Sequence, residues 1–324
     1  MRYRELGKTG LRVSEVGVGA WGLGGAMVVG GQPNSYGAAD DAEAIRMLHW
    51  AFDQGINFID TAPVYGFGHS EELIGQAIRG RRDQVIIETK VGEHHVNGQQ
   101  AWSFAPDFVR QALDASLRRL GTDYLDLYLL HLPASGGVGL AEALEAIEAA
   151  RATGKVRAVG ASIYDNALGI ELIRSGRCEV IQQVVNLLQP EATREVLPAA
   201  AEHGVGVVAR QALYRGFLTG NLTREVVFAD PGDRRSLMSR EEIADTFDRI
   251  DRFAFLTEGG RRRLIDAAVL YPLAQPAVAS VLSGAITQRE LADAVAVMEA
   301  QPLGDEEIAR IAAIHSGASG AGGA

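Results

Sequence analysis

Short apolar runs recur along the chain, and longer segments with helical spacing of apolar residues separate them. The runs are nearly continuous in Val, Ile and Leu, which is typical of parallel strands buried on both faces. Eight runs predict strands: 15–20, 56–60, 84–90, 124–131, 155–162, 179–186, 204–210 and 277–284.

The segments between these runs predict helices. They cover 40–55, 70–80, 106–121, 140–154, 193–204, the stretch around 240–272, and 287–300, and a further helix is predicted at 304–315. The segment 106–121 has Pro106 in its first turn and Gly121 just past its end, the arrangement that helix termini favour.

Eight strands, each followed by a helix, predict a parallel sheet, and eightfold repetition over this length favours a closed (β/α)8 TIM barrel. The stretch 3–16 predicts an N-terminal β-hairpin on the barrel floor. We expect a single domain over 1–316 and a disordered tail, rich in Gly and Ala, at 317–324. The long connections 91–105 and 214–240 should leave the C-terminal ends of strands three and seven, the face where barrel active sites lie.

Composition and charge indicate which classes of binding partner and which compartment to expect. The chain has 324 residues, a net charge of −10 and a pI of about 5.3, so an acidic surface disfavours nucleic acid and anionic membranes. The start lacks the apolar run of a signal peptide, and no stretch is apolar enough to span a membrane. The single cysteine, Cys178, fits a reducing compartment, and we expect a cytoplasmic protein. The oligomeric state is left open.

A glycine motif imitates a dinucleotide fingerprint. Gly17, Gly19 and Gly22 spell G-x-G-x-x-G after a strand, with Asp40 and Asp41 about 20 residues further on. The fingerprint requires a helix that begins at the last glycine, whereas this chain continues as a loop. We therefore interpret the motif as a turn at the barrel rim, with Asp40 or Asp41 capping the first helix.

Four polar residues lie where consecutive predicted strands end. Asp60 ends the second, Tyr65 follows it, Lys90 ends the third and His131 ends the fourth. In a barrel they would converge on one rim. A phenol is a weak acid at neutral pH, and a nearby ammonium paired with a carboxylate lowers its pKa, so the set suggests proton transfer to a carbonyl oxygen. No His/Cys cluster has metal-ligand spacing, so no metal is expected, and a hydride-donating cofactor would supply the other reactant.

Several long motifs resemble the aldo-keto reductases in the right order over essentially the whole chain. They include "LGKTGLRVSEVGVGAWGLGG", "NFIDTAPVYGFGHSEELIG", "SLRRLGTDYLDLYLLHLP", "GKVRAVGAS" and "SVLSGAITQRELADAV". The resemblance implies a barrel that binds a nicotinamide cofactor without a Rossmann domain. It implies Tyr65 as the proton donor, Lys90 and Asp60 as the pair that tunes it, and His131 as the group that orients the carbonyl.

The resemblance also implies cofactor contacts. Ser162 and Gln182 match residues that hold the nicotinamide carboxamide, although Ile163 replaces the usual Asn beside Ser162. Arg210 stands where the family often has a ring-stacking aromatic. Its planar guanidinium could stack on the nicotinamide, or it could form a salt bridge at the rim.

The segment after the eighth strand bears on the choice between NADP and NAD. Gly284 replaces the common Lys, and Glu290 replaces the Arg that binds the 2′-phosphate. A carboxylate repels phosphate and accepts a hydrogen bond from a ribose hydroxyl, so NAD is favoured, while Arg289 could still reach the phosphate.

Three further features have open interpretations. Trp21 and Trp102 fall in loops at the predicted open face and are either walls of a substrate pocket or loop packing. Glu88 is expected to point inward, on the same side as Lys90, with no partner evident in the sequence.

The sequence thus predicts an NAD(P)-dependent oxidoreductase that interconverts an aldehyde, ketone or sugar hemiacetal with its alcohol or lactone. The alternatives are a sugar 1-dehydrogenase acting mainly oxidatively and a non-catalytic binding barrel like the potassium-channel β subunits. A small-molecule carbonyl or sugar would be the partner in either enzymatic case.

Overall fold

A computed structural model describes residues 1–133 and 139–317, and its centre is a closed barrel of eight parallel strands. The barrel confirms the predicted fold class. In barrel order the strands are β3 (Val16–Gly19), β6 (Phe58–Asp60), β7 (Ile86–Val91), β10 (Leu125–His131), β11 (Val156–Ser162), β12 (Val180–Val184), β13 (Gly206–Arg210) and β14 (Val278–Ser283). Residues 318–324, most of the predicted tail, lie outside the described part of the chain.

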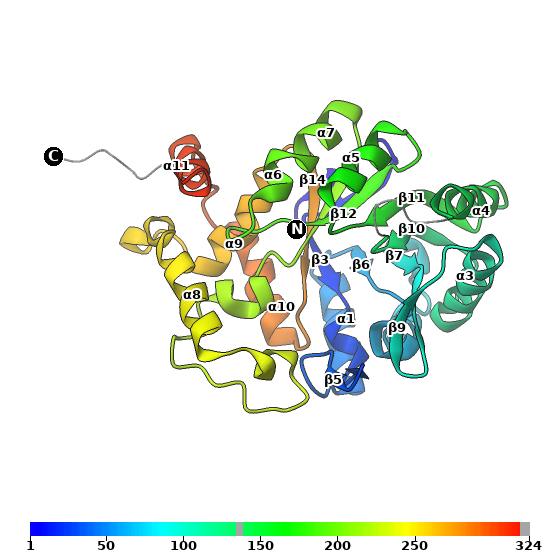
Figure 1. Cartoon of the computed structure of the whole chain (residues 1–324), viewed down its shortest axis with the longest axis horizontal. Helices are drawn as coiled ribbons and strands as arrows, with labels where there is room; N and C mark the ends of the chain where they lie inside the picture. The colour runs from blue at the N-terminus through cyan, green and yellow to red at the C-terminus, as the bar shows by residue number, and fades with distance from the viewer. Residues whose placement is uncertain (134–138, 318–324) are drawn as a thin grey trace.

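Helices surround the barrel and extend beyond it on one side (Figure 1). They are α1 (Asp41–Asp53), α2 (His69–Ala77), α3 (Pro106–Leu120), α4 (Leu140–Ala152), α5 (Asn166–Arg174), α6 (Glu191–Arg194), α7 (Val196–His203), α8 (Arg240–Asp251), α9 (Leu264–Leu273), α10 (Gln288–Ala296) and α11 (Asp305–His315). α3 ends at Gly121, which has the left-handed φ of 64° that the sequence pattern predicts there. The predicted segment 193–204 is divided between α6 and α7, and none of the predicted helical segments covers α5.

The predicted N-terminal hairpin closes the barrel floor. β1 (Tyr3–Glu5) pairs antiparallel with β2 (Arg12–Ser14), and Leu6, Leu11 and Val13 pack in one buried cluster with apolar residues of the barrel strands. The hairpin lies so close to the start of β13 that a side chain on Gly7 would come within 2.3 Å of the backbone of Gly206. This contact seals the end of the barrel opposite the expected active site.

Loops from three strands meet at the other end. The loop after β3 forms the hairpin β4 (Val28–Val29) and β5 (Gln32–Pro33), and the loop after β7 forms β8 (Glu93–Val96) and β9 (Gln99–Trp102). The two hairpin tips touch through a hydrogen bond from the Gly30 amide to the Gly98 carbonyl, 2.9 Å long. The 214–240 segment contacts the first loop, because the Arg234 amide donates to the Ser35 carbonyl at 2.9 Å.

The α8, α9 and α11 helices form a second apolar cluster beside the barrel, at the left of Figure 1. Ile311 of α11 packs there with Phe253, Phe255 and Tyr271. No helix within the described residues is long and apolar enough to cross a membrane.

Gly17 and Gly19 of the glycine motif lie in β3, and Gly22 begins a single 3-10 turn, Gly22–Gly24. The first α-helix begins only at Asp41. Asp40 caps α1 and accepts a hydrogen bond from the Glu43 amide at 2.8 Å. Both observations agree with the interpretation of the motif as a rim turn.

Candidate active site

The structure brings Asp60, Tyr65, Lys90 and His131 together at the C-terminal ends of β6, β7 and β10. Nζ of Lys90 forms an ion pair with Asp60 and donates to the Tyr65 hydroxyl at 3.2 Å. The His131 ring stands edge-on to the Tyr65 ring, with 6.1 Å between their centroids. The strand-end positions therefore predict the contacts correctly.

The loop after β6 holds Tyr65 through a tight backbone contact. Tyr65 begins a short 3-10 segment, Tyr65–Gly68, in which Gly66 has a φ of 63°. A side chain on Gly66 would come within 2.3 Å of the Gly24 carbonyl oxygen. Only glycine allows this approach, and it ties the Tyr65 loop to the loop after β3.

Lys90 is fully buried and uses all three of its N–H donors. They go to Asp60, to the Thr61 carbonyl at 2.7 Å and to Tyr65. Burial acts to lower the pKa of Lys90, but the Asp60 carboxylate, with Tyr65 and Glu88, raises it above its ordinary value. Lys90 is therefore a permanent cation with a fixed position.

Tyr65 departs from one expectation. The sequence predicts that Lys90 lowers the pKa of the phenol. Burial raises it further than Lys90 lowers it, so the pKa of Tyr65 lies above its ordinary value without ligands. The phenol is protonated at neutral pH, as a proton donor must be.

Glu88 finds the partner that the sequence did not supply. It is fully buried, and its Oε1 accepts a hydrogen bond from Nε2 of Gln182 on β12. Burial, followed by the nearby Asp60 carboxylate, raises the pKa of Glu88 well above its ordinary value. Oε2 of Glu88 has no hydrogen-bond partner among the described residues, and Glu88 and Asp60 both accept from Nε2 of Gln182.

Gln182 and Ser162 are already bonded to each other. The Ser162 hydroxyl donates to Oε1 of Gln182 at 2.8 Å, and Nε2 of Gln182 donates to Asp60 at 2.7 Å and to Glu88. Both amide hydrogens of Gln182 are therefore used. The oxygens Ser162 Oγ and Gln182 Oε1 can still accept hydrogen bonds from a carboxamide.

Arg210, at the end of β13, contacts a backbone carbonyl and an aromatic ring of this chain. Its Nη2 donates to the Ile163 carbonyl at 2.8 Å, and its guanidinium lies 4.0 Å from the centroid of the Tyr164 ring. No carboxylate within the described chain forms an ion pair with it, and its buried Nε has no partner. Arg210 therefore forms no salt bridge at the rim with any described residue.

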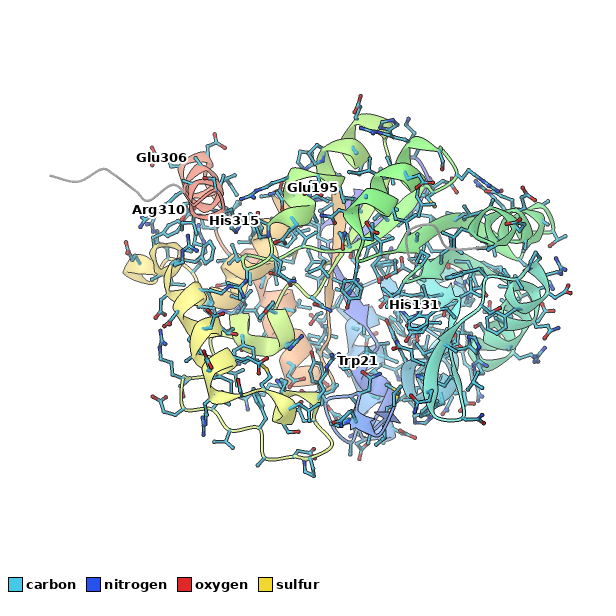
Figure 2. All side chains as sticks on the ribbon, viewed as in Figure 1. Trp21, His131, Glu195, Glu306, Arg310 and His315 are labelled. Carbon is cyan, nitrogen blue, oxygen red and sulfur yellow. The ribbon has the colours of Figure 1, made fainter. Side chains whose placement is uncertain are left out.

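A cavity of about 1190 Å³ opens over these residues. It runs from Asp60, Tyr65 and His131 past Ser162 and Arg210 to Gly284 and Glu290 at the start of α10. Trp21 lines it, as one of the two interpretations predicts, and Figure 2 shows Trp21 and His131 near the centre of the view.

Two predicted residues are not brought to this cavity. Trp102 ends β9 and pairs with Glu93 at the base of the hairpin, but it does not line the cavity and is 46% exposed. Arg289 is exposed on α10, outside the cavity lining, although its neighbour Glu290 lies within it. Of the two interpretations of Trp102, the pocket wall is therefore not supported.

Several residues of the cavity wall are not evident from the sequence pattern. Glu93 is buried beside His131, and Arg215 and Arg234 line the wall without an ion pair to any described residue. The two arginines come from the 214–240 connection. This connection carries a net positive charge, whereas the protein as a whole is acidic. That contrast was the signal in the sequence that could have identified the two arginines.

The amides at the start of α10 bind carboxylates of the chain itself. Glu290 folds back so that its Oε2 accepts from the Ile286 amide at 2.9 Å, and the Glu290 amide donates to the Thr287 hydroxyl at 3.3 Å. Glu43 of α1 accepts from the Gln288 amide at 3.2 Å. Two carboxylates therefore already bind amides at the start of α10.

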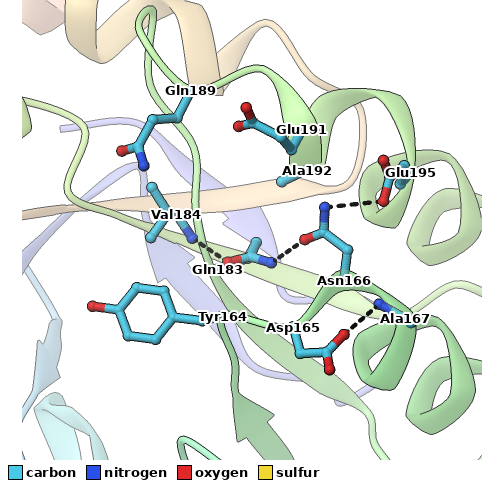
Figure 3. Close-up of a pocket in the computed structure, with 10 residues that line it drawn as sticks. All are labelled: Tyr164, Asp165, Asn166, Ala167, Gln183, Val184, Gln189, Glu191, Ala192 and Glu195. Carbon is cyan, nitrogen blue, oxygen red and sulfur yellow. Dashed lines mark hydrogen bonds between the residues drawn. The ribbon is translucent and has the colours of Figure 1, made fainter. Parts of the chain in front are cut away.

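A second hollow of about 450 Å³ borders the cavity at Tyr164 and Gln189 (Figure 3). Its polar side chains bond to one another. Gln183 donates to Asn166 at 2.8 Å, and Asn166 donates to Glu195 at 3.1 Å. These contacts fix the surface between α5 and α6.

Comparison with known proteins agrees with this geometry. The model of the aldo/keto reductase family matches residues 15–316. The chain is 34% identical over 298 residues to the aldo-keto reductase YhdN of Bacillus subtilis, covering 88% of this chain and 85% of the relative. It is 30% identical over 311 residues to the NADH-specific methylglyoxal reductase of Escherichia coli, covering 92% and 94%.

A solved structure is also similar to this chain in fold and sequence. The glycerol dehydrogenase AKR11B4 of Gluconobacter oxydans has a TM-score of 0.82 and 30% identity, covering 97% of this chain and 95% of that one. The fold and family define an NAD(P)-dependent oxidoreductase that interconverts carbonyl and alcohol groups. The chain belongs to the aldo/keto reductase family.

Proposed function

We propose that Tyr65 is the proton donor in reduction and the proton acceptor in oxidation of a small carbonyl or sugar substrate. The observation that carries this is the 3.2 Å contact between Nζ of Lys90 and the Tyr65 hydroxyl, with Lys90 fixed by Asp60. A buried cation beside the phenol stabilises the phenolate that remains after the proton has left. His131 lies beside Tyr65 and contacts the substrate on the same side of the cavity.

The cavity fits a nicotinamide dinucleotide. It is long enough to join the barrel mouth to α10, and Arg215 and Arg234 offer positive charge to a diphosphate. Ser162 and Gln182 would hold the carboxamide through their remaining acceptor capacity, and Arg210 would lie beside the ring. The cofactor, when bound, donates or accepts the hydride, and the protein residues handle the proton.

Tyr65→Phe tests this assignment. The variant keeps the ring and removes only the acid, so turnover should fall by about 10²–10⁴ while cofactor binding changes little. Tyr124→Phe is the matched control, because Tyr124 precedes β10 at the opposite end of the barrel. Steady-state kinetics over a panel of aldehydes, ketones and sugars, with both cofactors, gives the measurement. Most of the activity surviving in Tyr65→Phe would show that another group moves the proton.

We further propose that NAD(H) is preferred over NADP(H). At the start of α10 the amides that could bind a 2′-phosphate already bind Glu290 and Glu43, and Glu43 is held by Arg46 at 2.8 Å. An added phosphate would face two carboxylates, whereas a ribose hydroxyl can donate to one of them. The NADH-specific relative from Escherichia coli supports the same preference.

Gly284→Lys with Glu290→Arg tests the preference. A Cβ on Gly284 meets no atom within 4 Å, so a longer side chain fits there without strain. The double variant should move the ratio of kcat/KM toward NADP(H) by roughly tenfold or more, the effect of replacing a repulsive charge by attractive ones. Arg289→Ala is the companion control and should leave the ratio unchanged. A wild-type preference for NADP(H) that is lost in Arg289→Ala would contradict the proposal.

A further inference from the structure

Glu88 is a buried carboxyl group to which the proposed reaction gives no role. It lies on β7 before Lys90, deeper in the barrel, and its register partners are Asp60 on β6 and Leu127 on β10. Oε1 accepts a hydrogen bond from Gln182, and Oε2 is buried with no hydrogen-bond partner among the described residues. An unpaired oxygen in a dry interior makes the ionised form costly, so Glu88 keeps its proton.

The charges around Glu88 oppose one another. Burial, and then Asp60 on β6, raise the pKa of Glu88 well above its ordinary value, while Lys90 on β7 acts in the opposite direction. Lys90 spends its three donors on other groups, so it acts on Glu88 only through space. Gln182 of β12 is neutral, and the apolar side chains of the barrel interior include Phe58, Leu127, Leu129, Val180, Val208 and Leu282. One further positive charge near Glu88 can therefore shift the balance toward the ionised form.

Gln182 connects Glu88 to the place proposed for the nicotinamide. Oε1 of Gln182 accepts from the Ser162 hydroxyl at 2.8 Å, and its Nε2 donates to Glu88. Ser162 and Gln182 would hold the carboxamide, so Glu88 bonds directly to a residue of the cofactor site. The nicotinamide ring of NAD⁺ carries a positive charge that the ring of NADH lacks. In a barrel interior of low dielectric constant, such a charge acts strongly on a nearby carboxyl group.

We infer that Glu88 is the counter-charge for the oxidised cofactor: it holds a proton in the free protein and beside NADH, and it releases that proton to the solvent when NAD⁺ binds. The inference rests on the proposed function, because it requires the nicotinamide to lie at Gln182. Linkage makes the effect reciprocal, so NAD⁺ binds more tightly as the pH rises, while Glu88 leaves the affinity for NADH unchanged. Oxidation of an alcohol by NAD⁺ also releases a proton, so the same rise in pH favours both the oxidised cofactor and the oxidation.

Isothermal titration calorimetry in buffers of different ionisation enthalpy counts the protons that leave on binding. At pH 7.5, NAD⁺ should release about 0.5–1 proton and NADH about none, and the dissociation constant of NAD⁺ should fall roughly three- to tenfold per pH unit. NADH is the matched ligand, because the two cofactors differ only in the nicotinamide ring. Glu88→Gln keeps the acceptor for Gln182 and cannot ionise, so it should abolish both the excess release and the pH dependence of NAD⁺ binding.

Tyr65 and Glu93 also line the cavity and carry protons that a nearby cation could displace. His131 is not such a source, because burial, followed by two nearby cations, holds its pKa well below its ordinary value and the ring is neutral at pH 7.5. Tyr65→Phe and Glu93→Gln are therefore the control variants, and both should keep the excess release. Loss of the release in either control, with its retention in Glu88→Gln, would overturn the inference.

The wild type alone can refute the inference, so the result does not depend on whether a variant folds. Equal proton release with NAD⁺ and NADH overturns the inference and leaves the proposed function intact. A wild type that binds neither cofactor would overturn the proposed function, and the inference with it.

Discussion

Glu88 should make the stability of this protein fall as the pH rises, and Glu88→Gln should remove that effect. The carboxyl group is fully buried, and the nearby cation, Lys90, spends its three donors on other groups. Its pKa is therefore raised well above the ordinary value by burial and by Asp60. The Gln side chain keeps the acceptor for Gln182 and replaces the acid proton with an N–H that can donate to Asp60.

The sign and size follow from proton linkage. Above the unfolded pKa of about 4.3, the unfolded chain has lost the proton and the folded chain still holds it. Folded Glu88 thus binds one more proton, and the free energy of unfolding falls by about 1.4 kcal/mol per pH unit until the pH reaches the folded pKa. The variant has no proton to lose. Its stability relative to wild type should therefore rise by about 2.7 kcal/mol between pH 6 and pH 8 if the folded pKa lies above that window.

Urea unfolding at a series of pH values gives the difference in the free energy of unfolding between wild type and Glu88→Gln. Glu145→Gln on α4 controls for the loss of one negative charge from an acidic surface. The pH at which the difference stops growing measures the folded pKa of Glu88. A difference that is flat from pH 5.5 to pH 8 would refute the reasoning, since it would mean that Glu88 is ionised inside the barrel.

Two other predictions concern single side chains. Burial raises the pKa of the Cys178 thiol to about 12, so at pH 8 the native protein should react with a thiol reagent far more slowly than the urea-unfolded protein; equal rates would place the thiol at the surface. Arg210→Ala should weaken cofactor binding by about 0.5–2 kcal/mol with little change in melting temperature, and an unchanged affinity in a fluorescence titration would show that Arg210 only supports the Ile163 loop.

Local patterns in the sequence were sufficient to predict the barrel. A strand period or a helix period is a property of neighbouring residues, so the eight strands and most of the helices could be predicted without tertiary contacts. Parallel strands all end at the same side of a barrel, so the positions of Asp60, Lys90 and His131 at strand ends also predicted that they meet. The role of Asp40 as a helix cap follows from the same kind of local rule.

Tertiary structure decided what these side chains bond to and how they ionise. Glu88 bonds Gln182, which is 94 positions away, and Glu43 reaches the Gln288 amide across 245 positions. Tyr65 has a raised pKa because burial outweighs Lys90, and the balance depends on how much water the surrounding loops exclude. Glu290 illustrates the limit most clearly. Its place in the sequence matches a phosphate-binding residue, but its carboxylate turns back to the helix start and accepts from the Ile286 amide, which otherwise has no partner among the described residues.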